Sequence, residues 1–336
     1  MRYTWALAAF GVALALPASA LAHSPVFTSG NHSPATAYQI VDPAKSWAIY
    51  AGLDQPGIAD YYRFTMSAGE RIQLSLITPT SPSQSGFLPS FALLVPGRQS
   101  EGSVPEFVEV PAGYGAVVIS GSDPGQAIYE PFSPGWFYEV GDLASSAPTT
   151  GTYYVVVFDP TNRTGNYGLA VGYLESFTPL EIVSVPYNLQ IVYAWEGQSP
   201  FVAFLPMVLV LVFGGLALYL RRRRGMAPKG LSQWLAAGAA LAFLGSAAIT
   251  IYQMMLALNV TGAEVEALLS VGFATLSIVL AVVTLRYALG DRPTLNLKNR
   301  VVLIVIGLVA LFGWSGLYLG PTLAVLAGLV PSRGAD

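Results

Sequence analysis

His23 and His32 are the only histidines of the chain, and both lie near its N-terminus. Cleavage after Ala22 would make His23 the first residue, so that its amine and its imidazole could bind one metal ion together with the imidazole of His32. Three nitrogen ligands of this kind favour copper(II). Alternatively, both histidines are exposed polar residues on a loose terminus. The sequence therefore predicts a copper site whose formation depends on cleavage.

Aspartates next to glycine- and proline-rich turns are the second group of possible metal ligands. Their carboxylates are the oxygen ligands that calcium prefers, and Asp60 and Asp159 are the two that we assign to a calcium site. None of the aspartates belongs to an Asp-x-Asp-x-Asp loop, and aspartates at turns more often accept hydrogen bonds from their own backbone. The full set of candidates is Asp54, Asp60, Asp123, Asp142 and Asp159.

The first 22 residues have the pattern of a secretory signal peptide. Arg2 supplies a positive charge, residues 5–16 are apolar, and Ala20-Leu21-Ala22 is a small-x-small cleavage site. Residues 23–200 then carry five basic and fifteen acidic side chains, and the whole chain has no cysteine. These features exclude disulfides and thiol chemistry, and they argue against a nucleic-acid partner.

Four apolar segments predict four transmembrane helices within residues 201–330. Each is near the roughly 20 residues that cross a hydrocarbon core of about 30 Å, and basic residues cluster in the loops 221–229 and 286–300. The positive-inside rule places these loops in the cytoplasm and residues 23–200 outside. We also expect the chain after Pro321 to lie outside, with 322–330 as a short interfacial or re-entrant helix and 331–336 as a tail. The predicted spans are 201–220, 234–258, 265–285 and 301–319.

Residues 23–178 predict an extracytoplasmic antiparallel β-sandwich. Apolar and polar residues alternate in short segments separated by turn residues, as half-buried strands require, and we expect Tyr153, Val155 and Val157 to share one face of a strand. Residues 79–89, 96–114 and 121–150 are predicted to be surface loops, and 179–200 a connector with Tyr187, Tyr193 and Trp195 at the membrane surface. The predicted strands are 61–66, 71–76, 90–95, 116–120, 152–158 and 167–173.

The segment 129–138 is dense in aromatic residues outside the membrane half. Aromatic anchors of this kind dominate many binding interfaces, so the segment could bind a partner subunit or a glycan. Alternatively, its rings cap one end of the sandwich.

Several motifs resemble the bacterial pre-peptidase C-terminal domain over residues 40–175. They are Asp60-Tyr61-Tyr62-Arg63-Phe64, the glycine turn at Gly69 before the strand from Arg71, Gly151-Thr152-Tyr153-Tyr154-Val155 and Gly165-Asn166-Tyr167-Gly168-Leu169. The resemblance implies a jelly-roll-like sandwich that serves secreted enzymes as a non-catalytic accessory module for binding, targeting or folding. His23 and His32 in turn resemble the histidine brace of lytic polysaccharide monooxygenases, some periplasmic copper carriers and the soluble subunit of particulate methane monooxygenase.

These features together predict a non-enzymatic membrane protein whose outer domain is a binding or accessory subunit of a surface complex. Its expected partners are membrane lipid and other protein subunits. Because the predicted spans lack central ionisable residues, a transporter is disfavoured. The alternative is a copper-binding protein, either a carrier or an oxidase subunit, that uses His23 and His32.

Overall fold

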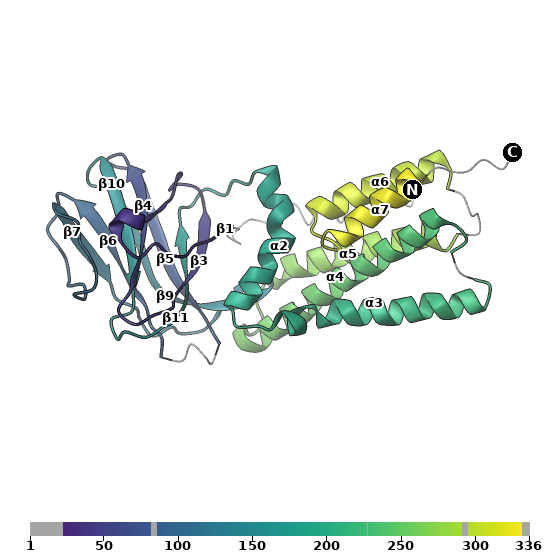
Figure 1. Ribbon diagram of the computed structural model, residues 1–336, viewed down its shortest axis with the longest axis horizontal. Helices are drawn as coiled ribbons and strands as arrows, with labels where there is room; N and C mark the ends of the chain where they lie inside the picture. Colours follow the sequence, from purple (N-terminus) through teal and green to yellow (C-terminus); the bar gives the residue numbers. More distant parts are fainter. Residues whose placement is uncertain (1–22, 82–85, 227, 291–294, 331–336) are drawn as a thin grey trace.

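The computed structural model describes residues 23–81, 86–226, 228–290 and 295–330. The predicted signal peptide and the tail 331–336 lie outside the described residues. A β domain and a helical half meet end to end along the long axis of the molecule (Figure 1). The β domain contains β1 (Ser24–Phe27), β2 (Tyr38–Gln39), β3 (Trp47–Leu53), β4 (Ala59–Met66), β5 (Arg71–Pro79), β6 (Ser90–Pro96), β7 (Tyr114–Ile119), β8 (Ile128–Glu130), β9 (Gly135–Ser146), β10 (Gly151–Phe158) and β11 (Gly165–Val171), with a short 3₁₀ helix at Pro34–Thr36.

Two mixed sheets form the β domain. One has the order β1-β3-β11-β5-β9-β8 and the other the order β2-β4-β10-β6-β7. Most neighbours are antiparallel, but β1 runs parallel to β3 and β2 parallel to β4. The prediction of a purely antiparallel domain is therefore wrong for the two N-terminal strands, which come from a segment where no strand was predicted.

The main core lies between the two sheets and contains the inward-facing residues of both. Strand β10 shows why, since Tyr153, Val155 and Val157 belong to this core whereas Val156 and Phe158 belong to a second cluster on the opposite face. This alternation is the period of two that a strand imposes. It confirms the predicted faces of β10 and supports a sandwich architecture.

The predicted surface loop 121–150 is wrong, because it contains a β-hairpin. Strand β9 pairs with β5 over most of its length and β8 pairs with the start of β9. The alternating pattern is hard to see here because much of β9 is exposed or only half-buried. The hairpin at residues 128–138 contacts the membrane helices.

The helical half contains six helices among the described residues. Three of them, α3, α4 and α5, are long and apolar enough to cross a membrane. The helices are α2 (Pro179–Trp195), α3 (Pro200–Arg223), α4 (Leu231–Thr261), α5 (Ala267–Ala288), α6 (Leu297–Phe312) and α7 (Leu319–Leu329).

The prediction of four spans is corrected to three. The expected fourth span, 301–319, is interrupted where Trp314, Gly316 and Leu317 adopt positive φ angles, a conformation that no α-helix can contain. Helix α6 therefore has 16 residues, about 24 Å of helix, which is shorter than the roughly 30 Å of a hydrocarbon core. The chain then reverses into α7.

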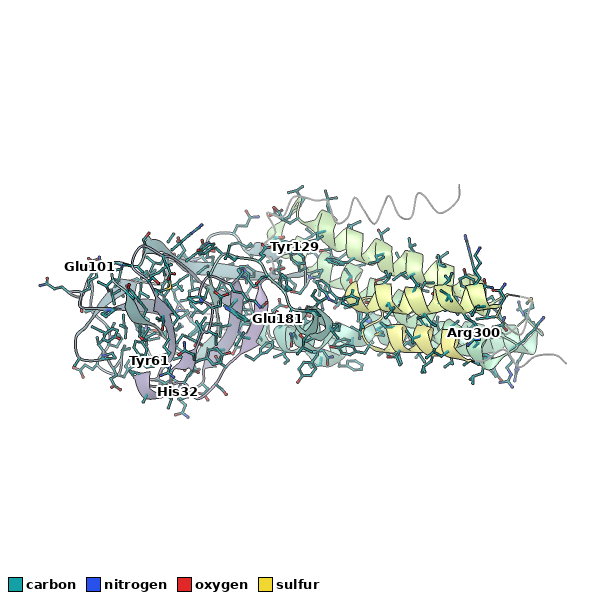
Figure 2. The ribbon with its side chains drawn as sticks, turned by 90° about the horizontal axis from the view of Figure 1, so that it is seen from above. His32, Tyr61, Glu101, Tyr129, Glu181 and Arg300 are labelled. Atoms are coloured by element: carbon teal, nitrogen blue, oxygen red, sulfur yellow. The ribbon has the colours of Figure 1, made fainter. Side chains whose placement is uncertain are left out.

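Helices α6 and α7 form an antiparallel pair. A Cβ atom at Gly328 would lie 2.6 Å from the carbonyl oxygen of Arg300, so the missing side chain allows the backbones to approach closely. The Arg300 guanidinium also donates to the carbonyl oxygen of Gly328 over 2.8 Å. The end of α7 therefore lies beside Arg300, at the end of the helices remote from the sandwich (Figure 2), and the expectation that α7 stays on the sandwich side is wrong.

Helix α2 lies across the junction between the sandwich and the other helices (Figure 1). It begins with a capping box in which Thr178 and Glu181 exchange hydrogen bonds. Of the three aromatic residues expected at the membrane surface, only Tyr187 is exposed, at 59%. Tyr193 and Trp195 are buried, because the sandwich covers this end of the helix.

Candidate binding site at the junction of the two halves

The hairpin of β8 and β9 contacts the membrane helices directly. The hydroxyl groups of Tyr129 and Ser270 lie 2.7 Å apart, and Ser270 donates to the carbonyl oxygen of Pro131 over 2.7 Å. Tyr129 packs in a buried cluster with Ala257 and Ala267. Figure 2 shows Tyr129 at the junction. The aromatic segment 129–138 therefore contacts helices of its own chain, an outcome that neither sequence interpretation had included.

Contacts between tilted aromatic rings continue this attachment into the helices. The ring centroids of Phe132 and Phe273 lie 6.3 Å apart, and those of Phe273 and Trp314 lie 5.1 Å apart. The indole of Trp314 donates to the carbonyl oxygen of Ile182 in α2. The hairpin, α5, the α6–α7 turn and α2 are thus joined in one continuous set of contacts.

Trp195, the last residue of α2, makes a second attachment to the sandwich. Its indole donates to the carbonyl oxygen of Tyr167 over 3.0 Å, and its own carbonyl oxygen accepts from Asn166 over 2.9 Å. Its ring meets that of Tyr50 edge-on at 5.0 Å. At the other end of α2, Lys45 and Glu181 form an ion pair of 2.6 Å. Contacts at both ends of α2 and at the hairpin hold the sandwich in one orientation on the helices.

A cavity of about 690 Å³ lies beside this junction. One wall is the outer face of the six-stranded sheet, and the loop between α4 and α5 contributes Glu264 and Glu266. The polar and charged residues that line it are His23, Tyr50, Arg71, Gln73, Ser75, Gln126, Tyr129, Glu130, Glu139, Asp142, Glu264 and Glu266.

Negative charge dominates the cavity lining. Five carboxyl groups face one arginine, whose guanidinium bonds to Gln73 and lies over the ring of Tyr173. Burial lowers the pKa of His23 to about 4, so its imidazole is neutral at physiological pH. A solute entering the cavity therefore meets an excess of acceptors and negative charge.

Two half-buried carboxyl groups, those of Glu130 and Glu196, lie where the hairpin meets the end of α2. Burial raises the pKa of Glu130 to about 7 and that of Glu196 to about 8. Glu130 accepts a hydrogen bond from the backbone N–H of Phe132, and Glu196 accepts one from Gln198 over 2.9 Å. The negative charge of Glu130 raises the pKa of Glu196 further.

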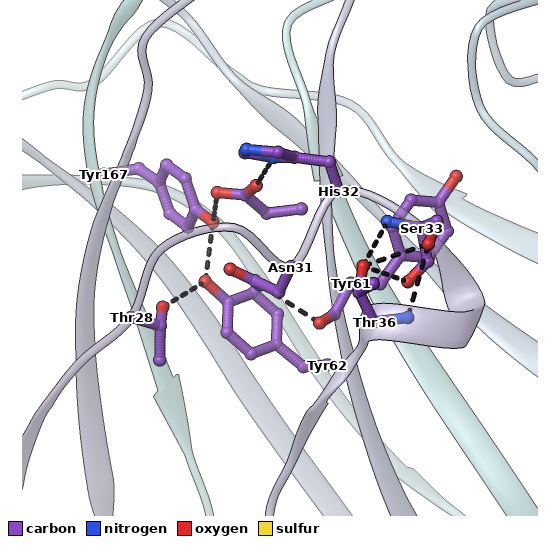
Figure 3. A network of polar contacts seen from close by, with 9 residues as sticks. Thr28, Asn31, His32, Ser33, Thr36, Tyr61, Tyr62 and Tyr167 are labelled. Atoms are coloured by element: carbon purple, nitrogen blue, oxygen red, sulfur yellow. Dashed lines mark hydrogen bonds and ion pairs between the residues drawn. The ribbon is translucent and has the colours of Figure 1, made fainter.

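A separate polar network inside the sandwich surrounds Asp60 (Figure 3). Tyr167 donates to Oδ2 of Asp60 over 2.6 Å, and Nδ1 of His32 lies 2.7 Å from Oδ1. The hydroxyl of Tyr62 lies 2.6 Å from that of Tyr167. Because the proton of Tyr167 is directed at Asp60, Tyr62 donates to Tyr167. Asp60, Tyr62 and Tyr167 belong to the motifs that carry the family resemblance, and the geometry gives them a structural role that links the two sheets.

The two histidines predicted to bind copper have different partners in the structure. Nδ1 of His23 lies 2.5 Å from the hydroxyl of Ser46, the residue before β3, whereas His32 contacts Asp60 in β4 of the other sheet. Among the described residues, no group of three or more His, Cys, Asp or Glu side chains is arranged to hold a metal ion. Copper at His23 and His32 remains a prediction.

The two aspartates assigned to calcium also lie in separate hydrogen-bond networks. Asp60 has the partners just described, and burial raises its pKa despite them. Asp159 accepts from the backbone of Leu88, from the backbone and hydroxyl of Thr161, and from the backbone of Arg163. It therefore closes its own turn, as the alternative interpretation proposed, and calcium remains a prediction at Asp60 and Asp159.

No known protein family matches the sequence, and no curated protein does. Among solved structures, the chain is similar to the pre-peptidase C-terminal domain of collagenase from Bacillus anthracis, at 19% identity and a TM-score of 0.22 over 40% of this chain and 91% of that one. It is also similar to CorA, a surface-associated copper-binding protein of Methylomicrobium album BG8, at 14% identity and a TM-score of 0.19 over 46% and 99% of the two chains. A third is the copper-binding secreted protein MopE of Methylococcus capsulatus, at 11% identity and a TM-score of 0.16 over 34% and 69%. Similarities this low carry no argument about function.

Sequence reasoning missed Glu130 and Glu196 as functional candidates. Each has a local signal, since Glu130 interrupts the aromatic segment between Tyr129 and Pro131, and Glu196 follows Trp195 just before the first span. A carboxyl group surrounded by aromatic residues is a candidate for a raised pKa. Their proximity was not visible, because 65 positions separate them in the sequence.

Proposed function

We propose that this chain is a membrane-anchored extracytoplasmic binding subunit that holds a small ligand in the junction cavity and serves as an accessory part of a membrane complex. The observation that carries the proposal is the cavity of about 690 Å³ beside a firmly attached sandwich. Cavities of roughly 300–1,000 Å³ are typical of small-molecule sites. A domain that served only as an anchored spacer would not need such extensive contacts with its own helices.

The charge of the lining favours a cationic ligand. Glu139, Asp142, Glu264 and Glu266 line the same cavity, with Arg71 as the one basic side chain in this lining apart from the neutral His23. A low-dielectric cleft of one sign concentrates solutes of the other sign. We therefore assign small organic cations as the ligand class.

Membrane insertion with the sandwich outside is supported by charge and length. Among the described residues, three helices are long and apolar enough to span. The C-terminal end of α3, whose last turn is basic, lies remote from the sandwich (Figure 1), as does Arg300 (Figure 2). Under the positive-inside rule, the basic end is cytoplasmic. Protease added to intact cells should then digest the sandwich and spare the loop 221–229, and cleavage of that loop from outside would contradict the orientation.

The outer surface of α3 supports the accessory role. Val208, Val212 and Phe213 are exposed at 45%, 58% and 64%, and α3 packs mainly on α4 within this chain. In a bilayer this surface meets lipid or a helix of another subunit. Both are the partners predicted from the sequence.

Ligand binding is tested with a variant that fills the cavity. Ala144→Trp places a large ring in its lining, and Ala68→Trp, on an exposed turn away from the cavity, is the matched control. In calorimetric titrations of the purified full chain with spermidine, putrescine and citrate, we expect binding of the amines only, weakened at least about tenfold by Ala144→Trp. Binding of citrate instead, or amine binding that Ala144→Trp leaves unchanged, would contradict the proposal.

A second candidate is copper binding through His23 and His32, supported by the neutral imidazole of His23 in the cavity lining. A shared site would require His32 to leave Asp60. Copper(II) titration followed by electron paramagnetic resonance should then show three nitrogen ligands in protein that begins at His23. It should show weaker binding after His32→Ala and in protein that begins at Leu21. Equal binding by all three forms would remove this candidate.

A further inference from the structure

Glu130 and Glu196 come from opposite sides of the junction and meet at the hairpin. Glu130 ends β8, and its carboxyl accepts from the backbone of Phe132, the residue whose ring contacts α5. The Glu196 carboxyl lies against the backbone of Gly135, where a Cβ atom would collide with it. The Glu130 side chain thus contacts the start of the turn between β8 and β9, and the Glu196 side chain contacts its end.

A chain of amide contacts extends from Glu196 into the helices. Gln198 donates to Glu196, and Gln198 and Gln253 exchange two amide hydrogen bonds of 3.1 and 2.8 Å. Gln253 is fully buried in α4. The position of Glu196 is therefore coupled both to the hairpin of the sandwich and to membrane helix α4.

The groups that face the two carboxyls are phenols and further acids. Tyr50 from β3 faces both, Tyr129 adjoins Glu130, and Tyr193 of α2 faces Glu196. No positive side chain within the described part of the chain offsets either carboxyl. The other titratable or charged groups of the adjoining cavity are His23, Arg71, Glu139, Asp142, Glu264 and Glu266.

We propose that Glu130 and Glu196 form a proton-binding site that holds the β8–β9 hairpin on the membrane helices and releases it when both carboxyls ionise. Two half-buried carboxylates without a cation beside them repel each other and lose part of their hydration, so binding of a proton strengthens the contact. The proposal requires no ligand in the cavity, although Glu130 is also part of the cavity lining. It makes the attachment of the sandwich sensitive to external pH.

The direction of the effect follows from proton linkage. The pKa values of Glu130 and Glu196 in the docked state are about 7 and about 8, both above the ordinary value of 4.5. The docked state therefore binds more protons than the released state, and docking is strongest below the ordinary pKa. It weakens as pH rises from there through the two raised values.

The test uses the absence of native cysteine. Ser270→Cys places one thiol in the fully buried contact with the hairpin, and Ser67→Cys, on an exposed turn, corrects for the reactivity of the thiolate itself. The labelling rate of the full chain in liposomes with a membrane-impermeant maleimide is measured as the ratio of the two variants. Between about pH 5 and about pH 8 this ratio should rise, by up to about tenfold per pH unit for each proton released.

Neutral substitutions decide whether the pair is responsible. With Glu130→Gln and Glu196→Gln together, the ratio should stay low and independent of pH, whereas Glu106→Gln with Glu109→Gln, at two exposed positions outside the cavity lining, should leave the rise unchanged. A flat ratio in the parent, or an equal rise in the Glu130→Gln, Glu196→Gln variant, would overturn the proposal. Infrared spectra give a second test. The unaltered protein should show a protonated carboxyl band at neutral pH, and this band should be weaker in the single variant Glu196→Gln. Absence of the band from the unaltered protein would also overturn the proposal.

Discussion

The interior of the sandwich and its junction with the helices both shield carboxyl groups from solvent, fully at Asp60 and partly at Glu130 and Glu196, but they surround them differently. Inside the sandwich, one carboxyl, Asp60, lies among hydrogen-bond partners that come from other segments, Tyr167 and His32. At the junction, Glu130 and Glu196 lie near each other with few neutral donors. Burial raises the pKa of all three. A carboxyl group that is surrounded by hydrogen-bond partners, such as Asp60, stabilises one structure. Two neighbouring carboxyl groups, such as Glu130 and Glu196, make the stability of an interface depend on pH.

The largest effect is expected when a carboxylate enters the sandwich core without donors. Val155 is fully buried between the sheets, and Val155→Asp should destabilise the fold by more than about 4 kcal/mol, because the charge has no partner. We expect no folded full-length protein in membranes, whereas Thr65→Asp on the exposed side of β4 should yield protein with a parent-like melting temperature. A Val155→Asp protein with unchanged melting would contradict the assigned core.

Removal of the Asp60 carboxyl group should have the next largest effect on stability. Asp60→Ala leaves the hydroxyl of Tyr167 without its acceptor and should cost about 3 kcal/mol in the free energy of unfolding. Asp54→Ala, at an exposed position, is the matched control. Thermal unfolding in detergent measures both, and equal melting of the two variants would show that the network around Asp60 does not stabilise the sandwich.

At the junction, removal of a carboxyl group is expected to stabilise the protein at high pH instead of destabilising it. Glu196→Gln keeps an acceptor for Gln198 and removes the charge, so the variant should melt higher than the parent at about pH 9, above the raised pKa, and similarly at about pH 5. Melting across this range separates the two kinds of carboxyl site. A variant that is less stable than the parent at every pH would place Glu196 with Asp60 as a structural group.

The smallest effect concerns one hydrogen bond between the hairpin and α5. Tyr129→Phe removes the hydroxyl that contacts Ser270 and should cost about 1 kcal/mol. Tyr138→Phe in β9, a tyrosine that packs against the sandwich core, is the control. Hydrogen exchange of residues 128–138 should increase in the first variant and not in the second, and equal exchange would show that the bond does not hold the hairpin.

The strands that could be predicted are those whose pattern is visible within a short stretch of sequence. Strands β4, β5, β6, β7, β10 and β11 were predicted near their observed bounds, because period-two alternation is visible in a short window. Strand β3 was missed because Trp47-Ala48-Ile49-Tyr50-Ala51 is apolar throughout, with one face in the core and the other on the junction. The fourth span was mistaken because hydropathy does not register the positive φ angles that end α6.

The candidate site depended on contacts that no local pattern encodes. Glu130, Glu196 and Gln253 come from a hairpin, a helix end and a membrane helix, and only the packing of the sandwich on α2 brings them together. The aromatic segment around Tyr129 was recognised as a binding element, but its binding partner proved to be α5 of the same chain. Residue types could therefore be predicted, and their partners could not.

Attachment of the sandwich at a fixed orientation is the central claim, and a distance measured across the cavity tests it most directly. Spin labels on Ala144→Cys in β9 and Glu264→Cys in the α4–α5 loop lie on opposite sides of the cavity in an otherwise cysteine-free chain. Double electron–electron resonance at about pH 6, below both raised pKa values, should give one narrow distance distribution. A broad distribution reaching far beyond the width of the cavity, as for a domain on a flexible tether, would contradict the account.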